Sequence, residues 1–358
     1  MRINTLALKN YRNCLDVELD FRSDKTLIIG KNAQGKTNIL ESIFFLSQLN
    51  SPRISNVRDL INFDANNMSI KAELNKSDTD ILMEYIVEDD KKVYKLNGLK
   101  TTTKNFKNVL KTVLFSTEDL SLLRGAPQDR RNWLDRAITQ IYPAYSERLK
   151  KYDKIRIQKN NLLKMCSVDE NLLDIFNSQL VITGANIILL RQKFLKELNE
   201  QAVPKYSMIA NNENFSMRYS VEYSSMDEIV SYLTELFNNS KQEEIIRKQS
   251  CYGPHRDDIY FYINGQNATK YASQGQQRTV VLSLKLGELS LIKEKLGEYP
   301  VLLLDDVLAE LDDIRQNYLL KSIENNIQTI ITSVDTVLFD EDFLSDVQIL
   351  KIQQGQVV

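Results

Sequence analysis

The chain has 358 residues, of which 42% are hydrophobic and 26% charged, and its formal net charge is −2. This length accommodates about two domains with buried cores. The near-neutral charge excludes a general polycation, so any nucleic-acid binding must come from a local patch. The three cysteines (Cys14, Cys166 and Cys251) lie far apart without a C-x-x-C pair, which argues against a disulfide framework or a zinc ribbon.

The sequence shows no targeting or membrane segment. The first thirty residues carry several charges, which excludes the apolar core of a signal peptide. The longest apolar stretch, residues 181–190, is only half a membrane span. We therefore expect a cytoplasmic protein that does not enter a membrane.

The N-terminal part is rich in strand patterns. Residues 15–21 alternate between apolar and polar side chains, which predicts a half-buried strand. Residues 26–29 predict a second strand that runs into a glycine-containing loop, and the apolar residues of 39–46 recur at helical spacing. An antiparallel meander with an Asn97-Gly98 turn and one further strand are predicted at residues 68–74, 81–87, 92–102 and 111–116.

The pattern changes to long helices between residues 126 and 249, with one short strand predicted at 219–223. Strand patterns return after residue 252, with a hairpin signal at Asn264-Gly265. Further strands are predicted at residues 300–306, 328–333 and 347–358. This layout predicts an α/β head formed by both ends of the chain, with a mainly helical lobe inserted between them.

Residues 30–37 read GKNAQGKT, the G-x-x-x-x-G-K-T pattern of a phosphate-binding loop (P-loop). Backbone N–H groups at a helix N-terminus cradle phosphate oxygens there, and glycines let the backbone approach. Lys36 is expected to reach the β and γ phosphates, and Thr37 to bind Mg²⁺. The alternative is a simple turn. The candidate nucleotide-binding residues of this segment are Gly30, Lys31, Asn32, Ala33, Gln34, Gly35, Lys36, Thr37 and Asn38.

Two further motifs lie far from this loop. The apolar residues 301–304 precede Asp305 and Asp306. If this is a parallel strand beside the P-loop, Asp305 reaches Mg²⁺ and Asp306 polarises an attacking water. The alternative is a strand that ends in an acidic turn.

Residues 273–277 read SQGQQ and precede an apolar-periodic helix. This has the S-x-G-x-Q form of the signature motif of ABC-type ATPases, a second phosphate site that faces the nucleotide of another subunit. On its own the segment is more typical of a helix cap. Together with the other motifs, it makes Ser273, Gly275 and Gln276 candidates for binding nucleotide in trans.

With these motifs the chain resembles the RecF family, bacterial recombination mediators related to the heads of structural-maintenance-of-chromosomes (SMC) proteins. The similar stretches are residues 6–13, 28–47, 114–135, 252–258, 271–279 and 300–312. The resemblance implies an α/β fold, an ABC/SMC-type P-loop ATPase head with an inserted mainly helical lobe. We assign residues 1–125 and 250–358 to the head and residues 126–249 to the lobe.

The resemblance also implies ATP and Mg²⁺ as cofactors, weak DNA-stimulated hydrolysis and an ATP-dependent homodimer. It implies binding to gapped or junction DNA, including its single-stranded part, and assistance to RecO and RecR in loading RecA. The biological setting would be DNA damage, repair, replication, recombination and the SOS response.

Residue roles follow from the same resemblance. Arg12 is placed near the nucleotide, Thr37 and Asp305 on Mg²⁺, and Lys36, Asp306 and Ser273 are the predicted catalytic residues. Asp306 stands where most ABC ATPases have glutamate, which fits slow turnover. Residues 310–312 look like the segment that crosses the dimer interface. The usual switch histidine is replaced by Thr332 and Ser333, and its role is left open.

Residues 127–165 contain ten cations and four acids, a local excess of six positive charges. Such a run is often only a solvated helix face. With the family resemblance it becomes the candidate DNA surface, and in the absence of a base-reading motif we expect it to bind the DNA backbone. The residues proposed to contact DNA are Arg130, Arg131, Arg148, Lys150, Lys151 and Lys154.

The sequence leaves two interpretations for each of two further residues, His255 and Trp133. His255 is the only histidine, which excludes a multi-histidine metal site, and it either senses nucleotide or stabilises a turn. Trp133 is more typical of a core residue than of a base-stacking one.

Three other functions of P-loop proteins fit the sequence less well. A transporter's nucleotide-binding subunit needs a surface for membrane helices, a small-molecule kinase has no use for a signature motif, and the insertion is too short for the arm of a chromosome protein.

Overall fold

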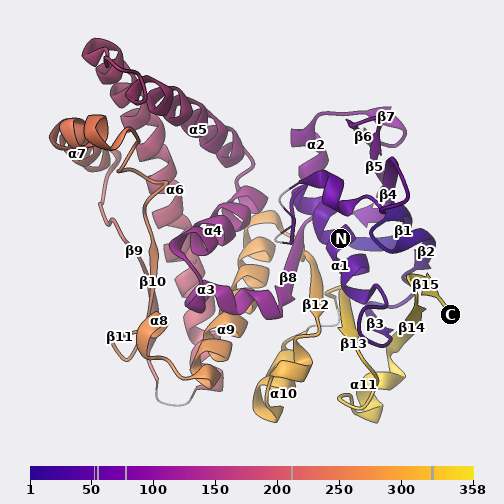
Figure 1. Cartoon of the computed structure of the whole chain (residues 1–358). Coiled ribbons are helices and arrows are strands. Elements are labelled where there is room, and N and C mark those ends of the chain that lie inside the picture. Colours follow the sequence, from indigo (N-terminus) through magenta and orange to yellow (C-terminus); the bar gives the residue numbers. More distant parts are fainter. Residues whose placement is uncertain (52, 55, 77–78, 211–212, 324–325) are drawn as a thin grey trace. The chain divides into compact units, whose positions relative to one another are not determined.

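The computed structural model of the chain describes residues 1–51, 53–54, 56–76, 79–210, 213–323 and 326–358. They form two compact units, the first comprising Met1–Asp119 with Val281–Val358 and the second Leu120–Val280. Figure 1 labels their elements. The divisions differ from the predicted boundaries after residues 125 and 249, because the strand at 259–263 pairs within the second unit. The assignment of residues 250–280 to an ATPase head therefore stays a prediction.

The first unit contains an antiparallel sheet in which the predicted meander is present, preceded by a long first strand that the sequence analysis did not predict. Met68, Ile70, Ala72 and Leu74 alternate with more exposed side chains and are buried, as expected for one face of a sheet packed on a core. The described strands of this sheet, in spatial order, are β2 (Cys14–Asp20), β1 (Arg2–Tyr11), β4 (Asn67–Lys76), β5 (Thr79–Glu88), β6 (Lys91–Leu96) and β7 (Leu99–Lys100).

The second sheet of this unit is mostly parallel and carries the two strands that precede the P-loop and Asp305. The Asp305 strand runs parallel to the P-loop strand, and β13 pairs with both and lies between them. The described strands, in spatial order, are β15 (Gln356–Val357), β14 (Val347–Gln353), β3 (Lys25–Ile29), β13 (Thr329–Ser333), β12 (Val301–Asp305) and β8 (Thr112–Ser116).

Helix α1 (Lys36–Gln48) contacts both sheets of the first unit. Its Phe45 packs edge-on against Tyr85 of β5, with ring centroids 5.0 Å apart. Its apolar residues share one buried cluster with Leu303 of β12 and Ile330 of β13. The start of α1 is thereby fixed to the sheet that carries Asp305. The unit's other described helices are α2 (Thr103–Lys107), α10 (Asp313–Ser322), α11 (Glu341–Ser345), η1 (Val57–Leu60) and η3 (Leu308–Glu310).

The second unit is mainly helical. Helices α5 and α7 both pack on the long helix α6, and Lys159 of α5 forms a fully buried ion pair with Glu244 of α7. The described helices that lie wholly within it are α3 (Ser121–Arg124), α4 (Pro127–Ile141), α5 (Ala144–Leu163), α6 (Glu170–Ile209), α7 (Met226–Arg247) and α8 (Ala268–Tyr271). The two divisions between the units fall inside η2 (Thr117–Leu120) and α9 (Gln274–Leu296).

Helix α6 is the one described helix that is long and apolar enough to cross a membrane by length and composition. Half of its most apolar window is buried inside the protein, where Arg191 also lies. The same criterion is met by core helices, so this is weak evidence for a membrane span.

A small antiparallel sheet completes the second unit. Its described strands, in spatial order, are β11 (Gln266–Asn267), β10 (Ile259–Ile263) and β9 (Phe215–Tyr219). The strand predicted at residues 219–223 is displaced toward the N-terminus, because pairing with β10 ends at Tyr219 and the chain then bends. The predicted hairpin at Asn264-Gly265 is confirmed by the β10–β11 pair.

Candidate functional site

The segment between β3 and α1 is the predicted P-loop. The strand ends at Ile29 and the helix begins at Lys36, which is the order that a phosphate-binding turn requires. The Lys36 ammonium group donates to the carbonyl oxygens of Gly30 at 2.7 Å and Lys31 at 3.2 Å. Lys31, Asn32 and Ala33 are exposed at the tip of the loop, whereas Lys36 is buried. The lysine therefore folds back over its own loop.

Both motif glycines are also required by contacts within the protein. A Cβ atom on Gly30 would lie 2.4 Å from the carbonyl oxygen of Ile352. Gly35 has a φ of 107°, which side chains rarely adopt, and its Cβ would lie 2.9 Å from Asn13 Oδ1. The approach to phosphate that the sequence analysis invoked is thus not the sole reason for glycine at these positions.

The structure brings together Thr37 and Asp305, which are 268 positions apart in the sequence. The Thr37 hydroxyl donates to Asp305 Oδ1 at 2.9 Å. The separation of β3 from β12 by one strand does not prevent this, because carboxyl ends of parallel strands meet at one edge of the sheet. Burial raises the pKa of the Asp305 carboxyl, while the hydroxyl groups of Thr332 and Thr37 oppose the rise.

Thr332, one of the two residues that replace the usual switch histidine, links the two aspartates. Its hydroxyl lies 2.9 Å from Asp305 Oδ1 and accepts the Asp306 backbone N–H at 2.8 Å. Asp306 has a φ of 50°, which lies in the left-handed region, and its N–H bond to Thr332 is made in this conformation. The position therefore keeps a polar role in the site without a histidine.

A cavity of about 230 Å³ borders this group. The adjacent oxygen donors at its wall, the Thr37 hydroxyl and the Asp305 carboxylate, are of the hard type that Mg²⁺ prefers, so these residues fit the predicted ion. The lining residues are Thr37, Leu40, Glu41, Phe44, Ser51, Arg53, Leu114, Ser116, Thr117, Glu118, Asp305 and Asp306.

Glu118 is one site residue that the sequence analysis missed. It lies in η2, directly after β8, whose Ser116 pairs with Asp305 of β12. Burial raises the pKa of its carboxyl; Arg53 opposes the rise, and Asp119, Asp305 and Glu41 add to it. An acid directly after a predicted strand was the available signal, but nothing in the sequence showed that β8 is the neighbour of β12.

Arg12 reaches α1 through a second missed residue, Glu41. Its guanidinium group makes two hydrogen bonds to the Glu41 carboxylate, at 3.0 and 2.9 Å. The same carboxylate accepts the Ser51 hydroxyl at 2.6 Å and lies 3.4 Å from Arg53. Because Glu41 follows Thr37 by one helical turn, Arg12 is anchored near the start of α1, in the region where the resemblance placed it.

Ser273 is the N-cap of α9, in the second unit. Its hydroxyl accepts the Gln276 N–H at 3.2 Å, and its own N–H donates to the Gln276 side chain at 2.8 Å. The Gln276 amide also donates to Glu213 at 2.7 Å. The helix-cap interpretation of this segment is therefore confirmed. It does not exclude a phosphate site, since an accepting hydroxyl keeps its proton for a second partner.

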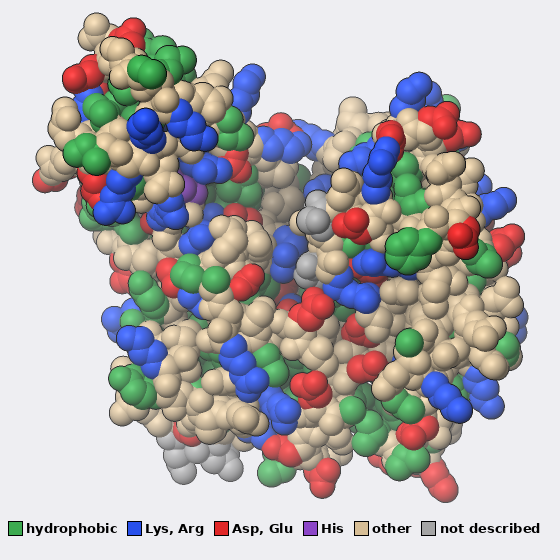
Figure 2. Space-filling view, viewed as in Figure 1, with side chains coloured by type: hydrophobic (Ala, Val, Ile, Leu, Met, Phe, Trp, Pro, Cys, Tyr) green, Lys and Arg blue, Asp and Glu red, His purple; other side chains and the backbone are tan. Residues whose placement is uncertain are grey.

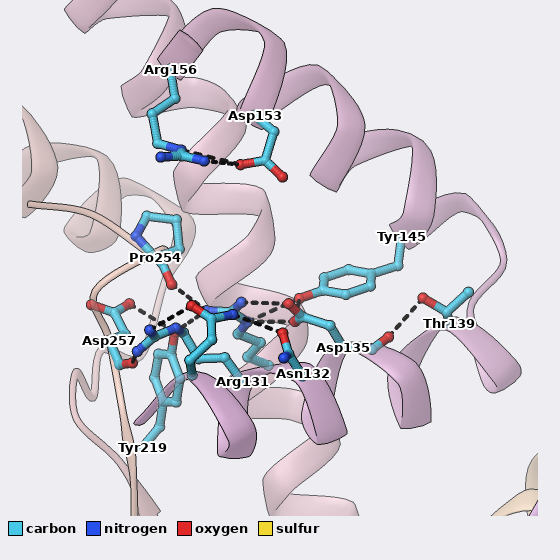
Figure 3. Close-up of polar contacts among 12 residues, drawn as sticks. Arg131, Asn132, Asp135, Thr139, Tyr145, Asp153, Arg156, Tyr219, Pro254 and Asp257 are labelled. Atoms are coloured by element: carbon cyan, nitrogen blue, oxygen red, sulfur yellow. Dashed lines mark hydrogen bonds and ion pairs between the residues drawn. The ribbon is translucent and has the colours of Figure 1, made fainter. Parts of the chain in front are cut away.

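Two of the predicted DNA-binding arginines are buried inside the second unit. Arg130 makes a two-point ion pair with Asp258, at 2.7 and 2.8 Å. Arg131 donates to the Asp257 carbonyl at 2.7 Å and to Gln128 at 2.9 Å, as Figure 3 shows in part. Because their guanidinium groups already have protein partners and little exposure, Arg130 and Arg131 are removed from the candidate DNA surface.

The other four predicted DNA contacts, all on α5, are exposed. Figure 2 shows Lys and Arg side chains gathered over the part of this unit that contains α5. Lys150 forms a long, exposed ion pair with Glu147 at 3.4 Å, which costs little to break. The exposed residues are Arg148, Lys150, Lys151 and Lys154.

His255 and Trp133 both have structural contacts. His255 Nδ1 lies 2.8 Å from the Tyr152 hydroxyl, and burial lowers the pKa of the imidazole to about 3. The ring is therefore neutral at physiological pH and serves to hold a turn. Trp133 is buried against Phe261, which confirms the prediction that it is a core residue.

Comparisons with known proteins agree with this geometry. The family described as the RecF/RecN/SMC N terminal domain matches residues 2–356. The DNA replication and repair protein RecF of Bacillus cereus (strain G9842) is 41% identical over 368 residues, covering all of this chain and 98% of that protein. The chain belongs to the RecF family. The RecF protein of Bacillus subtilis (strain 168) is 38% identical over 369 residues, covering both chains fully.

Solved structures give the same result. The recombination mediator protein RecF with ATP, of the RecFOR pathway, has a TM-score of 0.92 at 34% identity and spans 100% of this chain and 97% of that chain. An Smc head bound to a domain of ScpA has a TM-score of 0.59 at 16% identity, over 100% and 97% of the two chains, and shows a shared fold alone. The predicted ATPase-head fold with a long helical lobe is confirmed, and the transporter alternative is not favoured.

Proposed function

We propose that this chain is an ATP-dependent DNA-binding protein of recombinational repair and replication restart. It binds gapped or junction DNA as an ATP-induced homodimer and helps RecO and RecR to load RecA. The observation that carries this proposal is the hydrogen bond between Thr37 and Asp305, which joins two distant motifs at one cavity. Membership of the RecF family supports the biological role, and the role implies a cytoplasmic location.

In this proposal the first unit binds ATP. The N–H groups of the loop from Gly30 to Gly35 and the Lys36 ammonium bind the phosphates, and Asn38 and Arg12 flank them. To reach ATP, Lys36 exchanges the carbonyls of Gly30 and Lys31 for phosphate oxygens. Thr37 and Asp305 would hold Mg²⁺, which neutralises charge on the β and γ phosphates.

Hydrolysis needs residues on either side of the γ-phosphate. Asp306 polarises the attacking water from the same subunit, and its short side chain fits slow turnover. Ser273 and the backbone at Gly275, with Gln276 beside them, donate to the γ-phosphate bound by the other subunit. The Ser273 hydroxyl can do so while it caps α9, because capping uses its lone pair and not its proton.

DNA binds to the exposed basic residues of α5 through its phosphates. Phosphate contacts carry no sequence information, so binding follows backbone and junction geometry. Arg148, Lys150, Lys151 and Lys154 supply the charge. We infer that DNA on this surface stimulates the weak ATPase activity.

ATPase rates with three additions test the proposal. Hydrolysis is measured without addition, with a gapped duplex and with liposomes, at matched protein concentration. We expect gapped duplex alone to raise the rate. Stimulation by liposomes and none by DNA would contradict the proposal and reinstate the transporter alternative.

A further inference from the structure

The β14–β15 hairpin contacts the outer side of the P-loop. Strand β14 runs parallel to β3, with Lys351 opposite Ile29, the last residue before the loop. Beyond that point the turn of the hairpin binds Gln34 twice. The Gly355 N–H donates to the Gln34 carbonyl at 2.8 Å, and the Gln354 N–H donates to the Gln34 side chain at 2.6 Å.

The backbones of the loop and the hairpin leave no room for side chains where they meet. A Cβ on Gly35 would lie 3.3 Å from the Gly355 Cα, in addition to its clash with Asn13. Gly355 itself has a φ of 76°, and its Cβ would lie 2.3 Å from the carbonyl oxygen of Asn13. An alanine at this position must therefore displace backbone, which cannot yield as a side chain can.

Asn13 holds the loop from the neighbouring turn between β1 and β2. Its side-chain oxygen accepts the Asn38 amide at 2.8 Å, at the first turn of α1. Gly355 packs against the Asn13 carbonyl, so the hairpin, Asn13 and the loop form one interlocked set. The loop conformation thus depends on residues more than three hundred positions away.

Peptide geometry connects these contacts to phosphate binding. The Gln34 carbonyl and the Gly35 N–H belong to one planar trans peptide, so they point in opposite directions. Because the hairpin binds the carbonyl, the Gly35 N–H is directed away from the hairpin. We propose that the β14–β15 hairpin is a positioning element that orients the Gly35 N–H toward the phosphates of ATP. This inference rests on the proposed function of the loop.

Gly355→Ala tests the inference against a matched control. We expect the Kd for ATP, measured by calorimetry, to rise about tenfold, the scale of one lost hydrogen bond. The Kd for inorganic tripolyphosphate should rise by the same factor, because the hairpin acts on the phosphate cradle alone. Gly98→Ala is the control. Gly98 also has a positive φ, at 78°, but the position of its added Cβ is open space. Gly98→Ala should bind both ligands like the wild type. Both substitutions strain a backbone at positive φ and should lower the melting temperature, so each Kd is measured at a temperature at which the variant is fully folded.

Gln34→Ala provides a second variant that keeps the hairpin intact. It removes the acceptor of the Gln354 N–H and should weaken ATP binding about threefold, less than Gly355→Ala does. The double variant should bind ATP only slightly more weakly than Gly355→Ala, because both substitutions disrupt the same interaction between the hairpin and Gln34. Wild-type ATP affinity in Gly355→Ala overturns the inference, and if that variant does not fold, wild-type affinity in Gln34→Ala does so. Lys36→Met, assayed alongside, separates the two proposals: if it also keeps ATP affinity, the loop itself is not the phosphate site.

Discussion

The two units of this chain each contain a cluster of charged side chains beside a cavity. The cavity at Asp305 in the first unit has a volume of about 230 Å³, and that at Arg191 in the second about 200 Å³. Size therefore does not distinguish them. What differs is how far the protein itself satisfies the charges.

At Arg191 the charges are already paired. Each of its three guanidinium nitrogens donates to the protein, with both Asp135 oxygens at 3.0 and 2.9 Å, the Tyr219 hydroxyl at 3.0 Å and the Pro254 carbonyl at 2.6 Å. Figure 3 labels its partners Asp135, Tyr219 and Pro254. Through these bonds Arg191 ties α4, α6, β9 and the loop before β10 together. Such a network holds the unit together and has little capacity left for a ligand.

At Asp305 the arrangement is the reverse. Lys36 bonds to carbonyls of its own loop, and Thr37 and the two aspartates border the cavity. Weak internal partners can be exchanged for phosphate oxygens at small cost. The contrast supports the proposal that the group at Asp305 binds a ligand, whereas the group at Arg191 stabilises the second unit.

The largest expected effect is that of Ser273→Arg, at one of the residues of the second unit that we assign to the phosphate site in trans. Groups supplied in trans to a γ-phosphate contribute about 10³ to 10⁵ in rate, so hydrolysis and ATP-induced dimerisation should be lost. ATP affinity per monomer should stay close to that of the wild type. Light scattering with a non-hydrolysable ATP analogue measures the dimer.

Ser225→Arg is the control for that variant. Ser225 caps α7 as Ser273 caps α9, with its hydroxyl accepting a backbone N–H at 3.2 Å. Both variants lose a cap, at a cost of about 1 kcal/mol, but only Ser273 lies at the proposed phosphate site. If Ser273→Arg still dimerises with ATP like the wild type, Ser273 is a helix cap and nothing more.

Arg191→Met should act on stability alone. Removal of one partner of a buried ion pair costs about 3–5 kcal/mol of unfolding free energy, because Asp135 is left without its cation. Arg156→Met, which breaks the more exposed pair with Asp153, should cost about 0–1 kcal/mol. Urea denaturation measures both. Unchanged stability together with weakened DNA or ATP binding in Arg191→Met would show that the Arg191 cavity is a ligand site after all.

The smallest effect is expected on DNA binding. Simultaneous replacement of Arg148, Lys150, Lys151 and Lys154 by Ala should weaken binding evenly across sequences. The slope of log K against log salt should flatten by roughly one unit for each lost phosphate contact. A variant with four exposed lysines of the first unit changed to Ala loses the same charge and should keep the slope; these are Lys91, Lys92, Lys100 and Lys104. If the slope of log K against log salt changes equally in both variants, the α5 residues make no specific phosphate contacts and affect DNA binding only through their net charge.

Local patterns in the sequence predicted much of the fold and of the candidate site. The strand, loop and helix around residues 26–46 follow from apolar spacing and the P-loop motif, and the Thr37–Asp305 contact follows from parallel strands that share an edge. The strand at residues 328–333 was predicted, but its place as β13 between β3 and β12 was not, because an apolar run does not indicate where a strand lies in a sheet. Thr37 and Asp305, both assigned to one Mg²⁺ ion, lie within hydrogen-bond distance even though β13 separates their strands, and their role in binding the ion stays a prediction.

Exposure of charged residues was the least predictable property. Arg131 and Lys151 belong to one basic run, but Arg131 is buried because Asp257, 126 positions away, supplies its acceptor. The contact between Gly355 and Gln34 could not be predicted either, because the two residues are far apart in the sequence. Both depend on tertiary partners that single-sequence patterns do not contain.

We propose that Lys36, beside Thr37 and Asp305, exchanges its carbonyl partners for the phosphates of ATP. Calorimetry of ATP binding to Lys36→Met tests it most directly, with urea denaturation of the same protein. We predict a loss of affinity of roughly 10- to 100-fold, the scale of a charge-assisted hydrogen bond, at unchanged stability. Lys36→Arg, which keeps the charge but displaces it, should retain binding better than hydrolysis. Equal ATP affinity in the wild type and Lys36→Met, or a loss of stability in place of a loss of affinity, would contradict the claim.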